Sequence, residues 1–144
     1  MKNIEWSKIK TAHGFAAHIP EQILKLDSPA VEDRKKAYWQ IDNYVILQSD
    51  LYESAYYVID PLVKLLKVAT HKQEILNLLI EIANGYAPDT VVIELDNGIK
   101  KTLIEACRDK LREYREDFLL LKDSLEKDDK TKELLNELID LCED

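Results

Sequence analysis

The fold is decided by residues 50–85, which read DLYESAYYVIDPLVKLLKVATHKQEILNLLIEIANG. Apolar side chains recur along this stretch at spacings of three and four, which places them on one stripe of each of two amphipathic helices. A hairpin of two such helices cannot bury its apolar stripe alone, so neighbouring segments must cover it. The stripe comprises Leu51, Ala55, Val58, Ile59, Leu62, Leu65 and Leu66 in the first helix and Ile75, Leu78, Leu79 and Ile82 in the second.

The ends of these two helices carry local signals. Thr70 is the predicted N-cap of the second helix, with Gln73 in the capping-box position. Gly85 is the predicted left-handed residue that closes that helix. Pro61 lies inside the first helix, where it removes one hydrogen bond. Because the apolar stripe keeps its phase across Pro61, we expect one helix with a kink near Tyr57 to Pro61 rather than two helices.

Helices are also predicted on both sides of the hairpin, because the same spacing of apolar residues continues there. Pro20 favours a helix start, and Asp27-Ser28-Pro29 is a turn signal that ends that helix. The stripe that follows Ile99 extends over about three heptads, which predicts one long helix. The expected helical ranges are 3–10, 20–26, 30–48, 99–125 and 129–142, with Ser49-Asp50 as a cap before the hairpin.

Residues 84–98 are predicted to form an irregular insertion within a single domain that spans residues 1–144. Gly85, Pro88 and Asn97-Gly98 interrupt this segment. Asp96-Asn97-Gly98 is a turn signal that would allow a small hairpin. The residues after Gly98 also suit a helix, so the sequence leaves the hairpin open.

Composition favours an all-α domain and narrows the class of partner. The chain has 144 residues, 46% of them hydrophobic and 33% charged, with three Gly and four Pro, which suits long helices better than a turn-rich β fold. The net charge is −8, and residues 49–98 carry eight acidic and three basic side chains, or −5. Nucleic-acid affinity comes largely from Lys and Arg neutralising phosphates, so no nucleic-acid partner is expected. A basic protein partner would suit this charge.

The sequence predicts a cytoplasmic protein without a membrane partner. The first ten residues lack the apolar core of a signal peptide, and no apolar run approaches the ~20 residues that span a bilayer. Cys107 and Cys142 lie on apolar stripes, which predicts buried thiols in a reducing compartment. The sequence leaves open a disulfide between the two.

Catalytic and metal chemistry are not predicted. His13 and His18 lie five positions apart and His71 is distant, so no third close ligand completes a metal site. Neither cysteine has a histidine near it in the sequence, and no glycine loop suggests a phosphate-binding cofactor site. We therefore expect a protein that is not an enzyme and needs no cofactor; an enzyme whose site cannot be read from the sequence is the minor alternative.

An aromatic patch with acidic residues around it is the predicted partner-binding site. Tyr52 and Tyr56 lie one turn apart on the first helix of the hairpin, beside its main stripe. Aromatic side chains surrounded by acidic ones are typical of a hot spot for a basic partner. The alternative is that the rings fill the seam between neighbouring helices. The residues assigned to this site are Trp39, Asp42, Asp50, Tyr52, Glu53, Tyr56, Asp60, Asp89, Glu94 and Asp96.

A weak internal repeat runs through the chain. Residues 23–44, 62–82 and 119–141 each read as a helix that ends in leucines, a short polar turn, and a second amphipathic helix. Successive copies lie about 40 residues apart for the first pair and further apart for the second. Periods of ~40 to 47 residues with two helices each are typical of HEAT and armadillo units.

The chain resembles small bacterial HEAT-like helical proteins, several kinds of which are immunity proteins to secreted toxins. The resemblance covers residues 11–83 well and the last two helices only in pattern. It is carried by Gly14 with Ile19-Pro20, by Leu26-Asp27-Ser28-Pro29 before Glu32-Asp33-Arg34, and by Gln48-x-x-Leu51-Tyr52-Glu53-x-Ala55 leading into Pro61-Leu62.

This resemblance implies a HEAT/armadillo-like α-α superhelix of about three helical pairs. It also implies a non-catalytic immunity protein that neutralises a toxin, which for an acidic chain would be a basic nuclease domain. The alternative from another class is a generic scaffold or adaptor protein without a connection to toxins.

Overall fold

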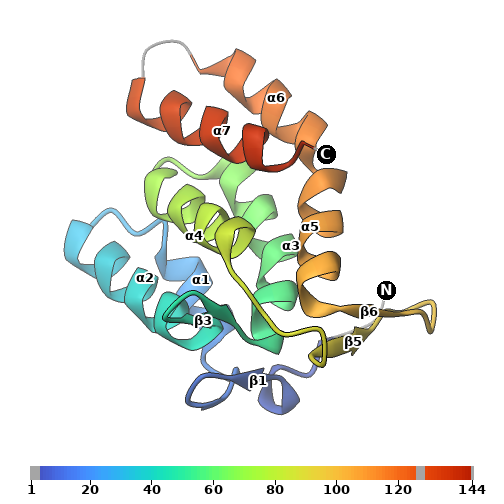
Figure 1. Cartoon of the computed structure of the whole chain (residues 1–144). Helices are drawn as coiled ribbons and strands as arrows, with labels where there is room; N and C mark the ends of the chain where they lie inside the picture. The colour runs from blue at the N-terminus through green and yellow to red at the C-terminus, as the bar shows by residue number, and fades with distance from the viewer. Residues whose placement is uncertain (1–3, 126–128, 144) are drawn as a thin grey trace.

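The computed structural model describes residues 4–125 and 129–143. This part of the chain is mostly helical, as the sequence predicts, with three small antiparallel hairpins beside the helices (Figure 1). None of its helices is both long enough and apolar enough to cross a membrane. The helices are α1 (Ile19–Lys25), α2 (Val31–Val45), α3 (Glu53–Val68), α4 (Gln73–Asn84), α5 (Leu103–Glu113), α6 (Arg115–Ser124) and α7 (Asp129–Leu141). The strands are β1 (Lys10–Thr11), β2 (Gly14–Phe15), β3 (Ile46–Leu47), β4 (Asp50–Leu51), β5 (Val92–Glu94) and β6 (Lys100–Thr102).

The α3–α4 hairpin lies at the centre of the molecule, between the α1–α2 pair and α5, with α6 and α7 across one end (Figure 1). Helix α4 contacts α2, α3, α5 and α7, and α3 contacts α1, α2 and α5. The apolar stripe that predicts this hairpin is buried, except that Leu65 is half-buried. Helix α3 also continues through Pro61 as one helix, as expected. The sequence periodicity therefore identifies the core correctly.

The N-terminal segment differs from its prediction. In place of a helix over residues 3–10, of which residue 3 lies outside the described residues, a short 3₁₀ turn (Trp6–Lys8) leads into the β1–β2 hairpin. The backbone N–H of Ala12 donates to the carbonyl of Tyr44 on α2. The hairpin thus contacts α2 where the sequence predicts a helix, and that helix would have only a few apolar residues to bury.

Helix α4 begins at Gln73, so the prediction of Thr70 as its N-cap is wrong. The carboxylate of Asp27, in the turn between α1 and α2, accepts a hydrogen bond of 2.8 Å from the backbone N–H of His71. This tertiary contact therefore holds the backbone two residues before the start of α4. No local capping signal reports such a contact.

The β3–β4 hairpin also replaces predicted helix. Helix α2 ends at Val45 instead of residue 48, and Ser49-Asp50 forms part of a hairpin instead of a helix cap. The hairpin turns through two residues, Gln48 and Ser49, whose φ angles are +50° and +70°. Positive φ at both positions is the geometry of a type I′ turn, which favours Asn-Gly. The sequence Gln-Ser carries no such signal.

Gly85 ends α4, but its φ is −72°, so the predicted left-handed conformation is wrong. The glycine is needed for another reason. A Cβ at this position would overlap the side chain of Leu51, which is 5% exposed. The backbone of Leu51 is held beside Gly85, because its N–H donates to the carbonyl of Tyr86 at 2.7 Å. Glycine therefore allows β4 to lie directly against the end of α4.

Replacing this glycine, in Gly85→Ala, is expected to lower the free energy of unfolding by about 1–3 kcal/mol, as overpacking does in well-packed interiors. Urea unfolding followed by circular dichroism measures the change. The neighbouring exposed substitution Asn84→Ala is the control and should stay within about 0.5 kcal/mol of the wild type. Adding Leu51→Ala to Gly85→Ala removes the overlapping atoms, so strictly additive losses in the double variant would contradict this packing.

The region after α4 also departs from the predicted long helix over residues 99–125. The hairpin that the sequence leaves open is present as β5–β6, and α5 begins only at Leu103. The hydroxyl of Thr102 accepts the N–H of Glu105, so Thr102-x-x-Glu105 is a capping-box sequence that the heptad pattern concealed. A second break at Tyr114 separates α5 from α6. Phe118 remains buried beyond it, so the apolar stripe keeps its phase and hides the break.

Candidate functional site

A hollow on the surface lies where the C-terminal ends of α2 and α4 meet the β3–β4 turn. Its volume is about 280 Å³. The two helices contact each other, and the turn joins α2 to α3 beside them. We call it the acidic hollow, and it is lined by Asp42, Asn43, Ile46, Leu47, Gln48, Ser49, Glu81 and Asn84.

Two carboxylates define the chemistry of the acidic hollow. Asp42 is 9% exposed, and its Oδ1 has no hydrogen-bond partner among the described residues. Glu81 is half-buried; its Oε1 accepts a 2.8 Å hydrogen bond from the hydroxyl of Tyr38, but its Oε2 has no partner there. No lining residue is basic. Burying an uncompensated carboxylate is costly, so the hollow is suited to receive a positively charged group from outside.

Among the described residues, the hydroxyl of Tyr38 is the one side-chain donor to Glu81, so Tyr38→Phe would leave both Glu81 oxygens without a partner there. The expected loss is about 1–3 kcal/mol of unfolding free energy at neutral pH. Burial, and then the hydrogen bond to Glu81, raise the pKa of Tyr38 above its usual value. The neutral phenol is therefore favoured in the folded state, and its contribution is complete below about pH 10 and lost as the pH rises further.

Unfolding measured at neutral and at alkaline pH should therefore show a smaller alkaline loss of stability for Tyr38→Phe than for the wild type. The control is Tyr86→Phe, because the Tyr86 ring is 57% exposed, and its stability should change by less than about 0.5 kcal/mol. Equal alkaline losses in the wild type and Tyr38→Phe would contradict the role of the Tyr38 hydroxyl.

The turn that forms one wall of the acidic hollow is strained. Gln48 and Ser49 both have positive φ, a backbone conformation that residues other than glycine adopt rarely. Strained backbone is found preferentially at binding and catalytic sites. The double variant Gln48→Asn/Ser49→Gly, which supplies the residues preferred in a type I′ turn, should raise the unfolding free energy by about 1 kcal/mol. Urea unfolding measures this, and an unchanged or lower stability would show that the turn carries no strain.

Exposed aromatic and apolar side chains flank the acidic hollow. Trp39 is 55% exposed and lies one helical turn before Asp42 and Asn43, on the same side of α2. Tyr86 is 57% exposed, and its N–H donates to the carbonyl of Ser49. Large aromatic side chains beside a polar pocket are the usual anchors of protein interfaces. The hollow is therefore lined by two carboxylates and has two exposed aromatic residues close to it, Trp39 and Tyr86, which we call the aromatic margin.

Three of the predicted site residues lie elsewhere: Tyr56 and Asp60 of α3 lie close to Lys110 of α5, and Asp96 lies in the turn of the β5–β6 hairpin. Lys110 Nζ lies 5.7 Å from the ring centroid of Tyr56 and 3.9 Å from Asp60 Oδ2. The hydroxyl of Tyr114 donates to Asp60 Oδ1. Burial lowers the pKa of Lys110, but Asp60 and other neighbours raise it to a net value above the usual one. Tyr56 and Asp96 line a second hollow that also holds Lys101, Asp109, Lys110 and Glu113.

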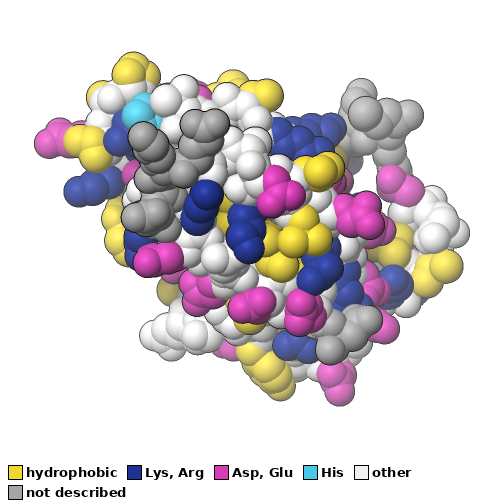
Figure 2. Space-filling model, turned by 90° about the horizontal axis from the view of Figure 1, so that it is seen from above, with side chains coloured by type: hydrophobic (Ala, Val, Ile, Leu, Met, Phe, Trp, Pro, Cys, Tyr) yellow, Lys and Arg dark blue, Asp and Glu magenta, His cyan; other side chains and the backbone are white. Residues whose placement is uncertain are grey.

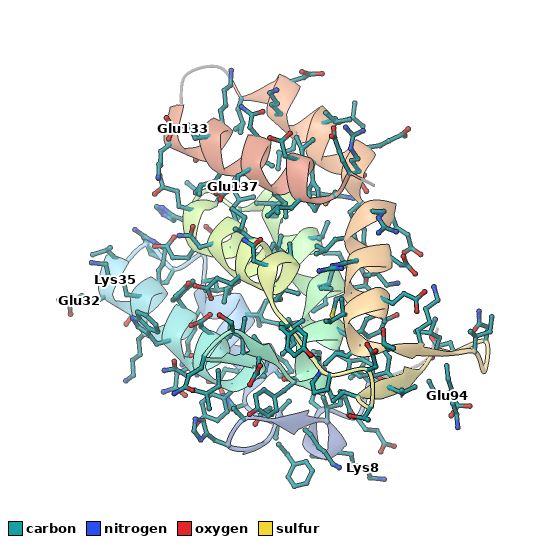
Figure 3. The ribbon with its side chains drawn as sticks, in the orientation of Figure 1. Lys8, Glu32, Lys35, Glu94, Glu133 and Glu137 are labelled. Atoms are coloured by element: carbon teal, nitrogen blue, oxygen red, sulfur yellow. The ribbon has the colours of Figure 1, made fainter. Side chains whose placement is uncertain are left out.

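The remaining predicted residues are spread over the surface. Tyr52 and Glu53 are half-buried at the start of α3, and Asp50 is exposed on β4. Asp89 is exposed between α4 and β5. Glu94 projects from the β5–β6 hairpin, away from the helices (Figure 3). The structure therefore does not bring the ten predicted residues into one patch; of these, Trp39 and Asp42 belong to the acidic hollow and its margin.

Two functional candidates were not predicted from the sequence. The first is Glu81. A signal for it is available, because a carboxylate among the leucines and isoleucines of α4 lies on a helix that is buried on most sides. Tyr86 follows Gly85 in a segment that reads as irregular, so nothing local indicates that it lies beside Ser49. Both residues lie at the site because segments that are distant in the sequence contact each other there.

Charge at the α6–α7 end of the molecule is mixed. Figure 2 views this end and shows Lys and Arg side chains among Asp and Glu side chains. Lys67 pairs with Asp117 at 3.2 Å, and Arg115 pairs with Glu143 at 2.8 Å. This end of the molecule is therefore not a uniformly acidic face.

Nucleophilic and metal sites find little support in the described part of the chain. Cys107 and Cys142 are buried free thiols, and burial raises their pKa values to about 12 and about 11, so both are poor nucleophiles at neutral pH. His18 Nε2 lies 3.0 Å from the carbonyl oxygen of Gln40, in a structural contact. Residues 4–125 and 129–143 contain no group of three or more His, Cys, Asp or Glu placed to hold a metal.

Comparisons with known proteins add no assignment. No family model, no curated protein and no solved structure matches this chain significantly. In the described part of the chain, the acidic hollow is the site with the most distinctive chemistry.

Proposed function

We propose that this chain is a non-catalytic protein-binding domain whose partner is a basic protein, and that the partner is a toxin domain which it neutralises as an immunity protein. The single observation that supports this proposal is the acidic hollow, which is lined by Asp42 and Glu81, two carboxylates that each have one buried oxygen without a hydrogen-bond partner among the described residues. Cationic side chains of a protein partner would compensate these charges.

The toxin connection rests on the resemblance to HEAT-like immunity proteins, and the arrangement of helices is compatible with it. Helices α1–α2, α3–α4 and α6–α7 form three consecutive pairs in which the two members contact each other. The Asp27–His71 hydrogen bond links the turns of the first two pairs. We propose that these pairs form a HEAT-like α-α superhelix, with α5 inserted between the second and third pairs.

The proposal is tested with the reading frame that lies upstream of the gene for this chain. An immunity protein is expected to follow a secreted toxin, whose basic C-terminal domain is then purified and mixed with this chain. Calorimetry should show a stoichiometric complex whose affinity falls as the salt concentration rises, because screening weakens charge steering. The enzymatic activity of the toxin domain should be lost in the saturated mixture.

Two outcomes would overturn the proposal in different parts. A complex whose affinity is indifferent to salt would contradict a charged interface. A toxin domain that stays active when saturated with this chain would contradict neutralisation and would favour the generic scaffold.

A further inference from the structure

From the acidic hollow we infer that this site holds the guanidinium group of one arginine side chain of the partner protein. The inference deepens the proposed function and rests on it for the identity of the partner as a protein. Asp42 is more than nine-tenths buried, and its Oδ1 has no hydrogen-bond partner among the described residues. None of the residues that line the hollow is basic, so none of them compensates the charge of Asp42. A neutral or anionic group would leave this charge uncompensated.

The distribution of acceptors suits a guanidinium better than an ammonium group. Asp42 comes from α2 and Glu81 from α4, and Gln48 and Ser49 line the hollow from the β3–β4 turn. Polar residues on three separate elements suit a ligand with several donors at fixed positions. A guanidinium provides five N–H donors in such a plane, whereas an ammonium group is a compact point charge that is more strongly hydrated.

The size and the walls of the acidic hollow also suit an arginine side chain. Its volume of about 280 Å³ is just under the range of roughly 300–1,000 Å³ that holds small molecules and cofactors, and it is far larger than a bare metal ion needs. Ile46 and Leu47 contribute apolar lining, against which the flat faces of a weakly hydrated guanidinium can pack. Two carboxylates are also too few for a site of hard-cation ligands without a third.

The aromatic margin fits the approach of the same side chain. Trp39 is exposed one helical turn before Asp42, and Tyr86 is exposed beside Ser49. Aromatic rings attract cations and stack on guanidinium planes, and arginine is the more frequent partner. A partner's arginine would thus enter past rings that favour it, and its guanidinium would lie in the hollow beside Asp42 and Glu81.

The test uses this chain alone, without any toxin, so that its failure is distinguishable from failure of the proposed function. Capped arginine, N-acetyl-arginine amide, is titrated into isotopically labelled protein and followed by amide NMR spectra. Saturable shifts are expected at residues 42–49, at Glu81 and at the indole N–H of Trp39, with a Kd on the order of 1 mM for a single side chain. Capped lysine should bind at least about five-fold more weakly, and Asp42→Asn should abolish the arginine shifts.

The control variant is Glu133→Gln/Glu137→Gln, which removes two exposed carboxylates on α7 (Figure 3) and should leave arginine binding unchanged. The amide spectrum of Asp42→Asn without ligand verifies that this variant is folded. Equal binding of capped lysine would overturn the guanidinium assignment, as would larger shifts at the same residues with Ca²⁺ or Mg²⁺. Shifts that do not saturate, or that persist in Asp42→Asn, would overturn the site itself.

Discussion

The double variant Asp42→Asn/Glu81→Gln is expected to bind the basic partner about 30-fold more weakly than the wild type, or worse. Each substitution keeps the shape of the side chain and removes a charge that lines the acidic hollow. Removing one side of a buried charge pair at an interface costs about 2 kcal/mol or more, and 2 kcal/mol corresponds to roughly 30-fold in Kd. The loss should appear mainly as faster dissociation, which surface plasmon resonance measures directly.

The same double variant should be at least as stable as the wild type. Asp42 Oδ1 and Glu81 Oε2 are buried without hydrogen-bond partners in residues 4–125 and 129–143, so replacing each carboxylate by an amide removes the cost of burying a charge. The free energy of unfolding should therefore stay the same or rise while the affinity for the partner falls. Such a trade-off is common where a binding site contains groups that destabilise the free protein. An affinity loss accompanied by an equal loss of stability would instead indicate a damaged fold.

The control for this prediction is again Glu133→Gln/Glu137→Gln, which changes the net charge by the same amount. Because these two residues are exposed on α7 and do not line the hollow, they contribute only to long-range attraction. Their removal should weaken binding by less than about three-fold and should affect mainly the association rate. Similar losses in both double variants would mean that net charge, and not the hollow, governs binding.

The helical core could be predicted from the sequence because burial imposes a regular spacing on it. The residues that define the stripe of α4, such as Leu79 and Ile82, are buried as expected. Element boundaries were less predictable, since they depend on contacts between distant segments. Asp27 of another helical pair holds the backbone just before α4, and Gly85 is required by Leu51 of β4 and not by its own backbone conformation. Periodicity carries no information about such contacts.

The candidate site was predicted only in part, for an electrostatic reason. The sequence shows that Tyr56 and Asp60 lie near acidic residues, but it does not show that Lys110 of α5 packs against both. Conversely, Asp42 looks like one acidic residue among many, and its importance comes from burial beside Glu81. Whether a carboxylate is compensated depends on which helices become neighbours, so charge counting along the chain cannot distinguish a paired cluster from an unpaired one.

The largest expected effect on stability comes from the centre of the core. Leu79 is fully buried on α4, the helix that contacts α2, α3, α5 and α7. Leu79→Ala removes buried methyl groups and leaves a cavity that neighbouring helices on several sides cannot collapse to fill, so the unfolding free energy should fall by about 2–5 kcal/mol. Since domains of this size are stable by only about 5–15 kcal/mol, the loss would be a large fraction of the total.

Urea unfolding measures this loss as a lower midpoint with an unchanged slope, because the surface exposed on unfolding stays nearly the same. The control is the same chemical change at an exposed position, Leu120→Ala, where the side chain is 68% exposed on α6. That variant should stay within about 0.5 kcal/mol of the wild type. A loss of less than about 1 kcal/mol would contradict the enclosure of α4 by its neighbours. It would also contradict a rigid position for Glu81, which lines the acidic hollow from the same helix.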